Sequence, residues 1–291
     1  MFKRNLVTLD FDGSTIRLLA AHEKQVTHWE SLRLPAEQMS MGVIHDPLTV
    51  GAALRDLFER NQAGRGRLVT SVTGLRAIAR VFTLPTVKER FLEDSVRHKI
   101  RQEIPLPLEE MDLSWHVVSR SREEQQVYAL AVPREAIDSQ VEALAAAGRR
   151  LHAMEIKPLA LARLAEGDPA LILNLEEHSL SIVVLSEGVP SIVRTVPFGG
   201  TRSTPEARLE LLLQELGRTT KFFNEAHKGR PLSPETAIYA TGEEFEKKEF
   251  LDLLARRHPG PVQVPACPLT HPAELPIAAY SVNVGLALKR V

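Results

Sequence analysis

Two stretches of the chain share one pattern of apolar and polar positions. Residues 6–19 read LVTLDFDGSTIRLL and residues 171–185 read LILNLEEHSLSIVVL, so each is an apolar run interrupted by a short polar turn. Such a pattern predicts a strand, a turn and a second strand. The two stretches align without a gap at an offset of 164 positions. The aligned pairs are Asp10 and Asn174, Asp12 and Glu176, Ser14 and His178, and Leu19 and Val183. An internal repeat in a chain of 291 residues favours two related halves.

The first part of the chain predicts a sheet and one helix. Apolar residues over 5–35 indicate three strands in a meander. Asp46 followed by Pro47 is typical of a helix start, and we expect this helix to end near Gly64. Its apolar residues fall on one helical face: Val50, Leu54, Leu57 and Phe58. A strand over 67–72 then completes the order β-β-β-α-β.

Residues 76–150 differ in pattern and predict a compact α/β insertion. Thr86 and Glu89 have the spacing of a capping box at a helix start. The helix would continue with one apolar face, formed by Leu92, Val96 and Ile100, and stop at Ile104-Pro105-Leu106-Pro107. The elements expected next are strands at 113–119 and 127–132 and a helix at 134–147, which Gly148 can end in a left-handed conformation.

The remaining chain completes the first half and then contains a second meander followed by helices and strands. The turn-forming sequence EGDP at 166–169 indicates a hinge between the halves. The expected elements are a strand at 151–156, a helix at 158–165, a second meander at 170–196, a long helix opening at Thr204 and Pro205, a strand at 237–240, a helix at 243–258, a strand at 261–264 and a helix at 276–289. The long helix has a broad apolar stripe, which indicates a buried face: Leu209, Leu212, Leu213, Leu216 and Phe223.

Composition narrows the classes of partner. With 36 Lys and Arg against 37 Asp and Glu, the chain lacks the basic excess that supplies affinity for nucleic acid. The single cysteine, Cys267, excludes an internal disulfide and a CxxC metal site, which fits a reduced cytosolic compartment. We expect no signal peptide and no membrane-spanning segment, because no uninterrupted apolar window is long enough.

Motifs of the common catalytic classes are absent from the sequence. It contains no GxxxxGK[ST] loop, no GxGxxG, no GxSxG and no HExxH, and no two of its ten histidines are spaced i, i+4. We therefore interpret single His and Ser residues as surface or hydrogen-bonded groups.

The repeated hairpin is the remaining candidate for chemistry. Two such hairpins facing each other across a cleft could hold phosphates with their backbone amides, while an aspartate at each strand end positions a cation. The turns would need small residues so that the amides can approach the phosphate. The first turn, with Asp10, Ser14 and Thr15, partly meets this requirement; the second, NLEEHS at 174–179, hardly does.

A series of short motifs along nearly the whole chain resembles the PilM family of type IV pilus assembly proteins, cytoplasmic relatives of the division protein FtsA and of actin. Each motif is weak alone, but their order is specific. They are Leu9-Asp10 to Leu19, Leu75-Arg76 to Pro85, Glu103-Ile104-Pro105-Leu106, Ala129 to Gly148, Glu155-Ile156-Lys157-Pro158, the second hairpin with Phe198-Gly199-Gly200, and Gly285-Leu286-Ala287-Leu288.

The resemblance implies an actin-like α/β fold of two ribonuclease-H-like halves with an FtsA-type inserted α/β subdomain. The first half would comprise 1–75 and 151–168, the insertion 76–150, and the second half 169–291 with a helical part around 203–230.

The resemblance also implies partners. PilM proteins bind the cytoplasmic N-terminal peptide of the inner-membrane protein PilN in a groove between the first subdomain and the insertion, which here would involve segments of about 67–84 and 90–120. A scaffold of this kind would be cytoplasmic and attached to the inner membrane through its partner. The pilus motor ATPase and self-association are further candidate interactions, and nucleic acid is not expected.

The chain departs from the family where nucleotide would bind. Intact family sites resemble DIGSSS in the first turn and DIGxxx in the second, whereas this chain has DFDGST and NLE, so Asp12 and Glu176 replace the glycines. A carboxylate about 4 Å from a phosphate charge repels it by a few kcal/mol at an effective dielectric constant of about 20. Asn174 also lacks the charge that an aspartate gives a magnesium shell. The degenerate cleft would retain Asp10, Ser14, Thr15, Asn174, Gly199, Gly200 and Gly242, with Asp10 as its one metal-side acid.

Two classes of function stay open. In the favoured hypothesis the protein is a non-catalytic scaffold without a cofactor, and Asp10 and Asp12 serve partly as turn formers. In the alternative it is a magnesium-dependent enzyme of the same fold that binds and hydrolyses ATP, or a phosphotransferase similar to sugar kinases. A cytoplasmic component of a type II secretion system would use the same fold and is a further alternative.

Overall fold

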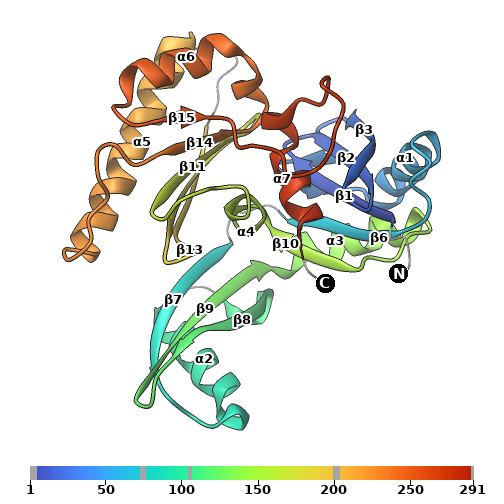
Figure 1. Ribbon diagram of the computed structural model, residues 1–291. Coiled ribbons are helices and arrows are strands. Elements are labelled where there is room, and N and C mark those ends of the chain that lie inside the picture. The colour runs from blue at the N-terminus through green and yellow to red at the C-terminus, as the bar shows by residue number, and fades with distance from the viewer. Residues whose placement is uncertain (1–4, 73–76, 104–106, 199–203, 290–291) are drawn as a thin grey trace. The chain divides into compact units, whose positions relative to one another are not determined.

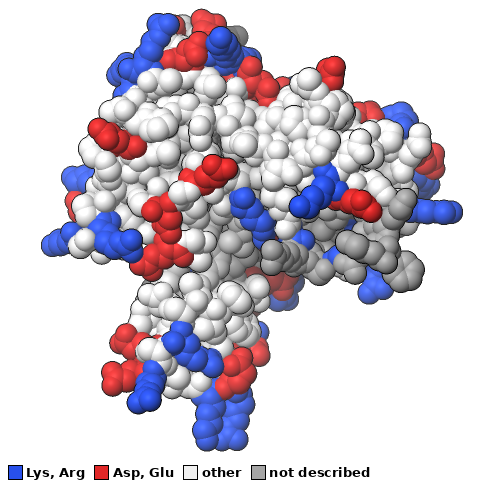
Figure 2. All heavy atoms as spheres, viewed as in Figure 1, with Lys and Arg blue, Asp and Glu red and all other residues white. Residues whose placement is uncertain are grey.

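A computed structural model of the chain describes residues 5–72, 77–103, 107–198 and 204–289 (Figure 1). Its contacts divide the chain into two compact units, Met1–Leu75 with Ser139–Val291, and Arg76–Asp138. Within the described ranges, no helix has the length and apolar character needed to cross a membrane. Figure 2 shows both acidic and basic side chains on the face drawn, mostly around a broad area of other residues.

The first sheet of the larger unit has the strand order β10-β6-β1-β2-β3. Its strands are β1 (Asn5–Asp12), β2 (Thr15–His22), β3 (Gln25–Arg33), β6 (Arg67–Val72) and β10 (Ala153–Ile156). The first three form the predicted meander, and β6 and β10 run parallel to β1. Helix α1 (Pro47–Arg60) follows the short hairpin of β4 (Met39–Ser40) and β5 (Val43–Ile44) and buries its predicted apolar face.

The second sheet repeats this arrangement with the order β15-β14-β11-β12-β13. Its strands are β11 (Ala170–Leu175), β12 (Ser179–Ser186), β13 (Val189–Pro197), β14 (Ile238–Thr241) and β15 (Val262–Gln263). The two hairpins share one register, since Asp10 pairs with Arg17 in the first and Asn174 with Ser181 in the second, both pairs offset by 164. The repeat recognised in the sequence is thus a structural repeat of strand order and pairing.

Helices complete each half. Helix α5 (Pro205–Ala226) is capped by the Thr204 hydroxyl, which accepts a hydrogen bond from the Ala207 amide at 3.3 Å, and it packs with α6 (Lys248–Arg257) beside the second sheet. Helices α4 (Lys157–Ala162) and α7 (Ile277–Ala287) lie between the two sheets (Figure 1). They approach closely at Gly285, where a Cβ atom would lie 2.1 Å from the Ala160 carbonyl oxygen.

The smaller unit has a three-stranded sheet of order β7-β9-β8. It comprises β7 (Ile78–Pro85), α2 (Glu89–Glu103), the 3-10 helix η1 (Leu108–Glu110), β8 (Met111–Arg120), β9 (Glu124–Pro133) and the start of α3 (Arg134–Ala146). Its core joins the predicted apolar face of α2 to the sheet: Leu92, Val96 and Ile100 with Phe82, Leu84, Val127 and Ala129. The rest of α3 belongs to the larger unit, where a Cβ atom on Gly51 would clash with Ala143 and Ala146.

Three local expectations were wrong. Thr86 does not begin a capping box, because α2 starts only at Glu89 and the Thr86 hydroxyl donates to the Ser121 carbonyl at 3.0 Å. Helix α1 ends at Arg60, where the Asn61 amide donates to the Leu57 carbonyl, and not near Gly64. The helix expected over 243–258 is split into the 3-10 helix η2 (Glu243–Glu246) and α6, since Lys247 is extended.

Candidate functional site

Six ionisable side chains from both halves of the larger unit meet where the two hairpins turn. They are Asp10 and Asp12 from β1, Arg17 from β2, Lys157 from the start of α4, Glu176 from the turn after β11, and Glu243 from the start of η2. The parallel strands β1, β6 and β10 end at the same edge of the first sheet, which brings β1 and α4 together. Asp10, Asp12, Arg17 and Lys157 are buried, the side chain of Glu176 is 11% exposed, and that of Glu243 is 70% exposed.

Arg17 joins three of the carboxylates. Its Nη1 lies 2.6 Å from Asp12 Oδ2 and 3.8 Å from Asp10 Oδ2. Its Nη2 lies 2.7 Å from Glu243 Oε2, in the second half. Burial lowers the pKa of the guanidinium, but attraction by Asp12 and Asp10 raises it more, so the net shift is upward. Arg17 therefore stays charged and links β2 to η2.

Lys157 forms a second link between the halves. Its Nζ lies 3.2 Å from Asp10 Oδ1 in the first half and 2.5 Å from Glu176 Oε1 in the second. Burial lowers the pKa of the ammonium, whereas Asp10 and Glu176 raise it by a larger amount. The ammonium group thus remains charged although the side chain is only 5% exposed.

Glu176 carries the excess negative charge of the cluster. Three carboxylates that are at most 11% exposed, those of Asp10, Asp12 and Glu176, face only two buried cations. Burial raises the pKa of Glu176 to about 7, the pull of Lys157 opposes this shift, and repulsion by Asp12 and Asp10 adds to it. One proton on Glu176 would balance the buried charges.

Hydrogen bonds fix the carboxylate of Glu176 in place. Its Oε1 accepts from Asn174 Nδ2 at 2.8 Å, and its Oε2 accepts from Ser179 Oγ at 3.0 Å. Asn174 is itself held, since Thr241 Oγ1 donates to Asn174 Oδ1 at 3.0 Å. In the first half Ser71 Oγ donates to Asp10 Oδ1 at 2.7 Å. The acidic oxygens that face Lys157 are therefore oriented by a second layer of polar groups.

The raised pKa of Glu176 predicts a pH-dependent stability. Its pKa of about 7 in the folded state, against 4.5 as the ordinary value, means that the folded state binds more protons than the unfolded state between these pH values. The free energy of unfolding should therefore fall as the pH rises through this window, by up to about 3 kcal/mol. Glu176→Gln should reduce this fall, as measured by urea unfolding at pH 5 and pH 8. The exposed Glu249→Gln serves as the control, and an unchanged pH dependence in Glu176→Gln would contradict the assignment.

The two hairpin turns touch each other. The Glu177 amide donates to Asp12 Oδ1 at 3.4 Å, Ser14 Oγ donates to Glu177 Oε2 at 3.4 Å, and Arg33 forms an ion pair with Glu177. The space left between the turns is a cavity of about 10 Å³ lined by Asp12, Gly13, Met41, Glu176, His178 and Ser179. About that volume is the least that holds one water molecule.

A larger cavity of about 590 Å³ lies beside the turns. Its basic side chains already have acidic neighbours, with Arg208 2.7 Å and Lys247 3.1 Å from Glu244 and Arg33 paired with Glu177. The ion pairs of Arg208 and Lys247 lower the pKa of Glu244 despite its partial burial, which raises it. An incoming anion would thus have to compete with carboxylates for these cations.

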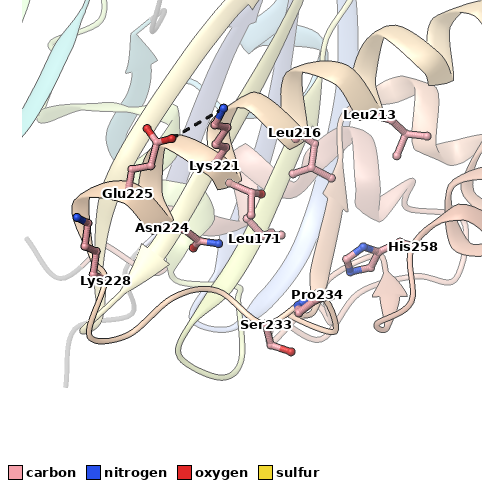
Figure 3. Close-up of a pocket in the computed structure, with 12 residues that line it drawn as sticks. Leu171, Leu213, Leu216, Lys221, Asn224, Glu225, Lys228, Ser233, Pro234 and His258 are labelled. Atoms are coloured by element: carbon pink, nitrogen blue, oxygen red, sulfur yellow. Dashed lines mark ion pairs between the residues drawn. The ribbon is translucent and has the colours of Figure 1, made fainter.

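A separate cavity of about 680 Å³ lies along α5 (Figure 3). Leu171, Leu213 and Leu216 supply its apolar part, and Lys221 and Glu225 form an ion pair of 3.9 Å on α5. Asn224 Oδ1 accepts from the Leu232 amide at 2.8 Å, and the His258 ring bonds to the Thr236 carbonyl at 2.8 Å. These four polar side chains therefore already have partners within the protein.

The residues proposed from the sequence for the nucleotide cleft have separate locations. Asp10 and Asn174 belong to the buried cluster, and Ser14 contacts the second turn. Thr15 lines the 590 Å³ cavity, and Gly242, with φ +100°, donates its amide to the Ala278 carbonyl at 2.8 Å. Gly199 and Gly200 lie outside the described residues.

Asp10 is the proposed metal-side acid, and its two oxygens face Lys157 and Arg17. The described part of the chain has no group of three or more His, Cys, Asp and Glu side chains arranged to hold a metal ion. Asp10 therefore has protein cations as neighbours on both oxygens.

Sequence reasoning missed three members of the cluster: Arg17, Lys157 and Glu243. The sequence around Arg17 contains one signal: a charged residue stands between apolar neighbours in a predicted strand. A charge in such a position needs a counter-ion. Lys157 lies in a motif of the family resemblance, but neither that motif nor the sequence around Glu243 indicates their charged partners.

Two five-stranded sheets of matching topology, separated by α4 and α7, are the architecture of the actin-like class of proteins. Among solved structures with this fold, the PilM–PilN type IV pilus biogenesis complex contains a similar chain, with a TM-score of 0.81, 22% identity and 97% of both chains covered. The ethanolamine utilization protein EutJ from Carboxydothermus hydrogenoformans has a TM-score of 0.58 at 14% identity, covering 99% of this chain and 90% of that one. The cytoplasmic domain of EpsL from the type II secretion system of Vibrio cholerae has a TM-score of 0.57 at 13% identity, covering 99% and 96%.

The chain belongs to the PilM family. The family model described as type IV pilus assembly protein PilM matches residues 8–206, which span both hairpins and the smaller unit. Comparison with curated protein sequences gave no match. The family resemblance and the actin-like fold class expected from the sequence are therefore confirmed.

Proposed function

We propose that this protein is a cytoplasmic scaffold of the inner-membrane platform that assembles type IV pili, and that it binds the cytoplasmic N-terminal tail of a PilN-like membrane protein. The observation that carries this proposal is membership of the PilM family together with a matching fold over 97% of a chain from the PilM–PilN complex. Attachment to the membrane would then come from the partner. The pilus motor ATPase and a second copy of the chain are further candidate partners of such a scaffold.

We also propose that the scaffold works without bound nucleotide. The carboxylates of Asp12 and Glu176 lie at the turns that would have to approach a phosphate, with a cavity of only about 10 Å³ between them. At an effective dielectric of about 20, each carboxylate about 4 Å from a phosphate charge would oppose binding by about 4 kcal/mol. Arg17 and Lys157 reduce this repulsion, but both cations are engaged by these acids and are not free to bind a phosphate themselves.

The alternative functions have weaker support. An active MgATP-binding protein would use Asp10 and Gly242, yet Asp10 is paired with Lys157 and the Gly242 amide is bonded to Ala278. The similarity to the type II secretion protein EpsL is a similarity of fold at 13% identity. The family match favours the pilus over the secretion system.

Titration calorimetry with the purified chain tests the proposal. A synthetic peptide from the cytoplasmic N-terminus of the PilN-like protein encoded beside it should bind with saturable heat at one peptide per chain, and equally well with and without 1 mM MgATP. The same MgATP should not raise the melting temperature. A ligand present at about 100 times its dissociation constant would add about 2.7 kcal/mol, which corresponds to a shift of several degrees.

The two parts of the proposal can fail separately. A folded protein that does not bind the peptide would contradict the pilus scaffold. An increase in melting temperature with MgATP that disappears in Asp10→Ala would contradict the nucleotide-independent part.

A further inference from the structure

We propose that the Lys157 ammonium is a built-in cation, seated in an internal site of acidic oxygens, that holds the two halves of the larger unit together without an added ligand. This inference rests on the proposed function only in assuming that no nucleotide occupies the cleft. It assigns to Lys157 the electrostatic role that a bound cation would otherwise have.

The position of Lys157 gives it contacts in both halves. It follows β10 of the first sheet directly and begins α4, and its Nζ lies between Asp10 Oδ1 at 3.2 Å and Glu176 Oε1 at 2.5 Å. Asp10 belongs to the first sheet, whereas Glu176 follows the last residue of β11 in the second. The ammonium is therefore a direct ionic link between residues that are 166 positions apart along the chain.

The site around the ammonium is built from oriented oxygens. Ser71 holds the oxygen of Asp10 that faces Lys157, with an Oγ to Oδ1 distance of 2.7 Å. Ser179 and Asn174 each donate to one oxygen of Glu176, at 3.0 and 2.8 Å. Carboxylates ordered in this way recognise a compact positive charge, and a primary ammonium is such a charge.

No second cation in the cluster is free to replace Lys157. Arg17 is engaged by Asp12 at 2.6 Å and Glu243 at 2.7 Å, and it lies 3.8 Å from Asp10. Without Lys157, the buried carboxylates of Asp10, Asp12 and Glu176 would face Arg17 alone. The resulting excess negative charge creates affinity for a cation from solution, provided that the space is left open.

Chemical rescue of Lys157→Ala tests this inference. The substitution removes three methylene groups and the ammonium, which together have the composition of n-propylammonium. We expect the melting temperature to fall by about 10 °C, the scale for breaking a buried ion pair in a domain of this size. Addition of n-propylammonium chloride at tens of millimolar should restore several degrees, whereas equal concentrations of 1-propanol or sodium chloride should not.

Matched variants separate the charge from the packing. Lys157→Met fills the space without a charge, so it should lose stability and show no rescue. Lys157→Ala combined with Glu176→Gln lacks one acidic partner and should show a weaker rescue. The exposed Lys248→Ala should keep the stability of the parent protein and not respond to n-propylammonium.

If Lys157→Ala does not fold in buffer alone, a refolding assay replaces the measurement of its melting temperature. In that case recovery of folded protein, followed by circular dichroism, should require n-propylammonium during refolding. The inference is overturned if Lys157→Ala is as stable as the parent, if n-propylammonium has no effect on its stability or refolding, or if the parent and Lys157→Met respond equally. Because peptide binding is measured on the parent protein, failure of the rescue and failure of the scaffold proposal are distinguishable.

Discussion

Replacing Arg17 by methionine is expected to lower the free energy of unfolding by about 3–5 kcal/mol, the cost of removing one partner from a buried ion pair. The guanidinium is the close cationic neighbour of Asp12, at 2.6 Å, and it also binds Glu243 across the two halves. Methionine retains much of the apolar length but leaves Asp12 buried without its counter-charge. Urea unfolding at pH 7 measures the loss.

The exposed arginine at position 33 is the matched control. Arg33 also pairs with an acidic residue of the second turn, Glu177, but its side chain is 72% exposed. Arg33→Met should therefore cost less than about 1 kcal/mol. If the two variants lost equal amounts of unfolding free energy, burial of Arg17 would not explain the contribution of its ion pairs to stability.

Gly285→Val is expected to have an effect of similar size through packing. A Cβ atom at this position would lie 2.1 Å from the Ala160 carbonyl oxygen and 2.5 Å from its carbon, so α7 would have to move away from α4. Overpacking in a core usually costs 1–3 kcal/mol, and we expect more than about 4 kcal/mol here because the contact is with backbone. Thermal unfolding followed by circular dichroism measures the loss.

Gly217 offers a helical glycine for comparison. It lies in α5, and a Cβ atom there would have no heavy atom within 4 Å beyond its own helix. Gly217→Val should change the stability by less than about 0.5 kcal/mol, since the helix propensity of valine is better than that of glycine by only about 0.4 kcal/mol. If Gly285→Val were as stable as Gly217→Val, close helix contact at Gly285 would not be required for folding.

The fold was largely predictable because its signals are local. The alternation of apolar residues around Asp10 and around Asn174 defines two hairpins, and a common offset reproduces their strand pairing. Asp46 and Pro47 mark the start of α1 correctly, with the Asp46 side chain accepting from the Thr49 amide at 3.1 Å. A residue near its own turn or cap can be interpreted from its neighbours in the sequence.

The site was less predictable because its bonds are not local. Arg17 meets Glu243 across 226 positions, and nothing in either local sequence indicates the other. The prediction of a capping box was wrong for a related reason, because the Thr86 hydroxyl donates to the carbonyl of Ser121, 35 residues further along the chain. The sequence predicted that Asp12 and Glu176 disfavour a phosphate, but it did not reveal that they are counter-ions of Arg17 and Lys157.

The contact between Lys157 and Glu176 has a consequence for how this protein can change in evolution. Glu176 and Lys157 lie 2.5 Å apart, so a mutation of Glu176 to glycine, as an open turn would need, leaves the Lys157 ammonium without its nearest partner. A mutation of Lys157 alone leaves Glu176 without its cationic neighbour. Because we expect either single step to destabilise the protein, we expect the two positions to change together among related chains.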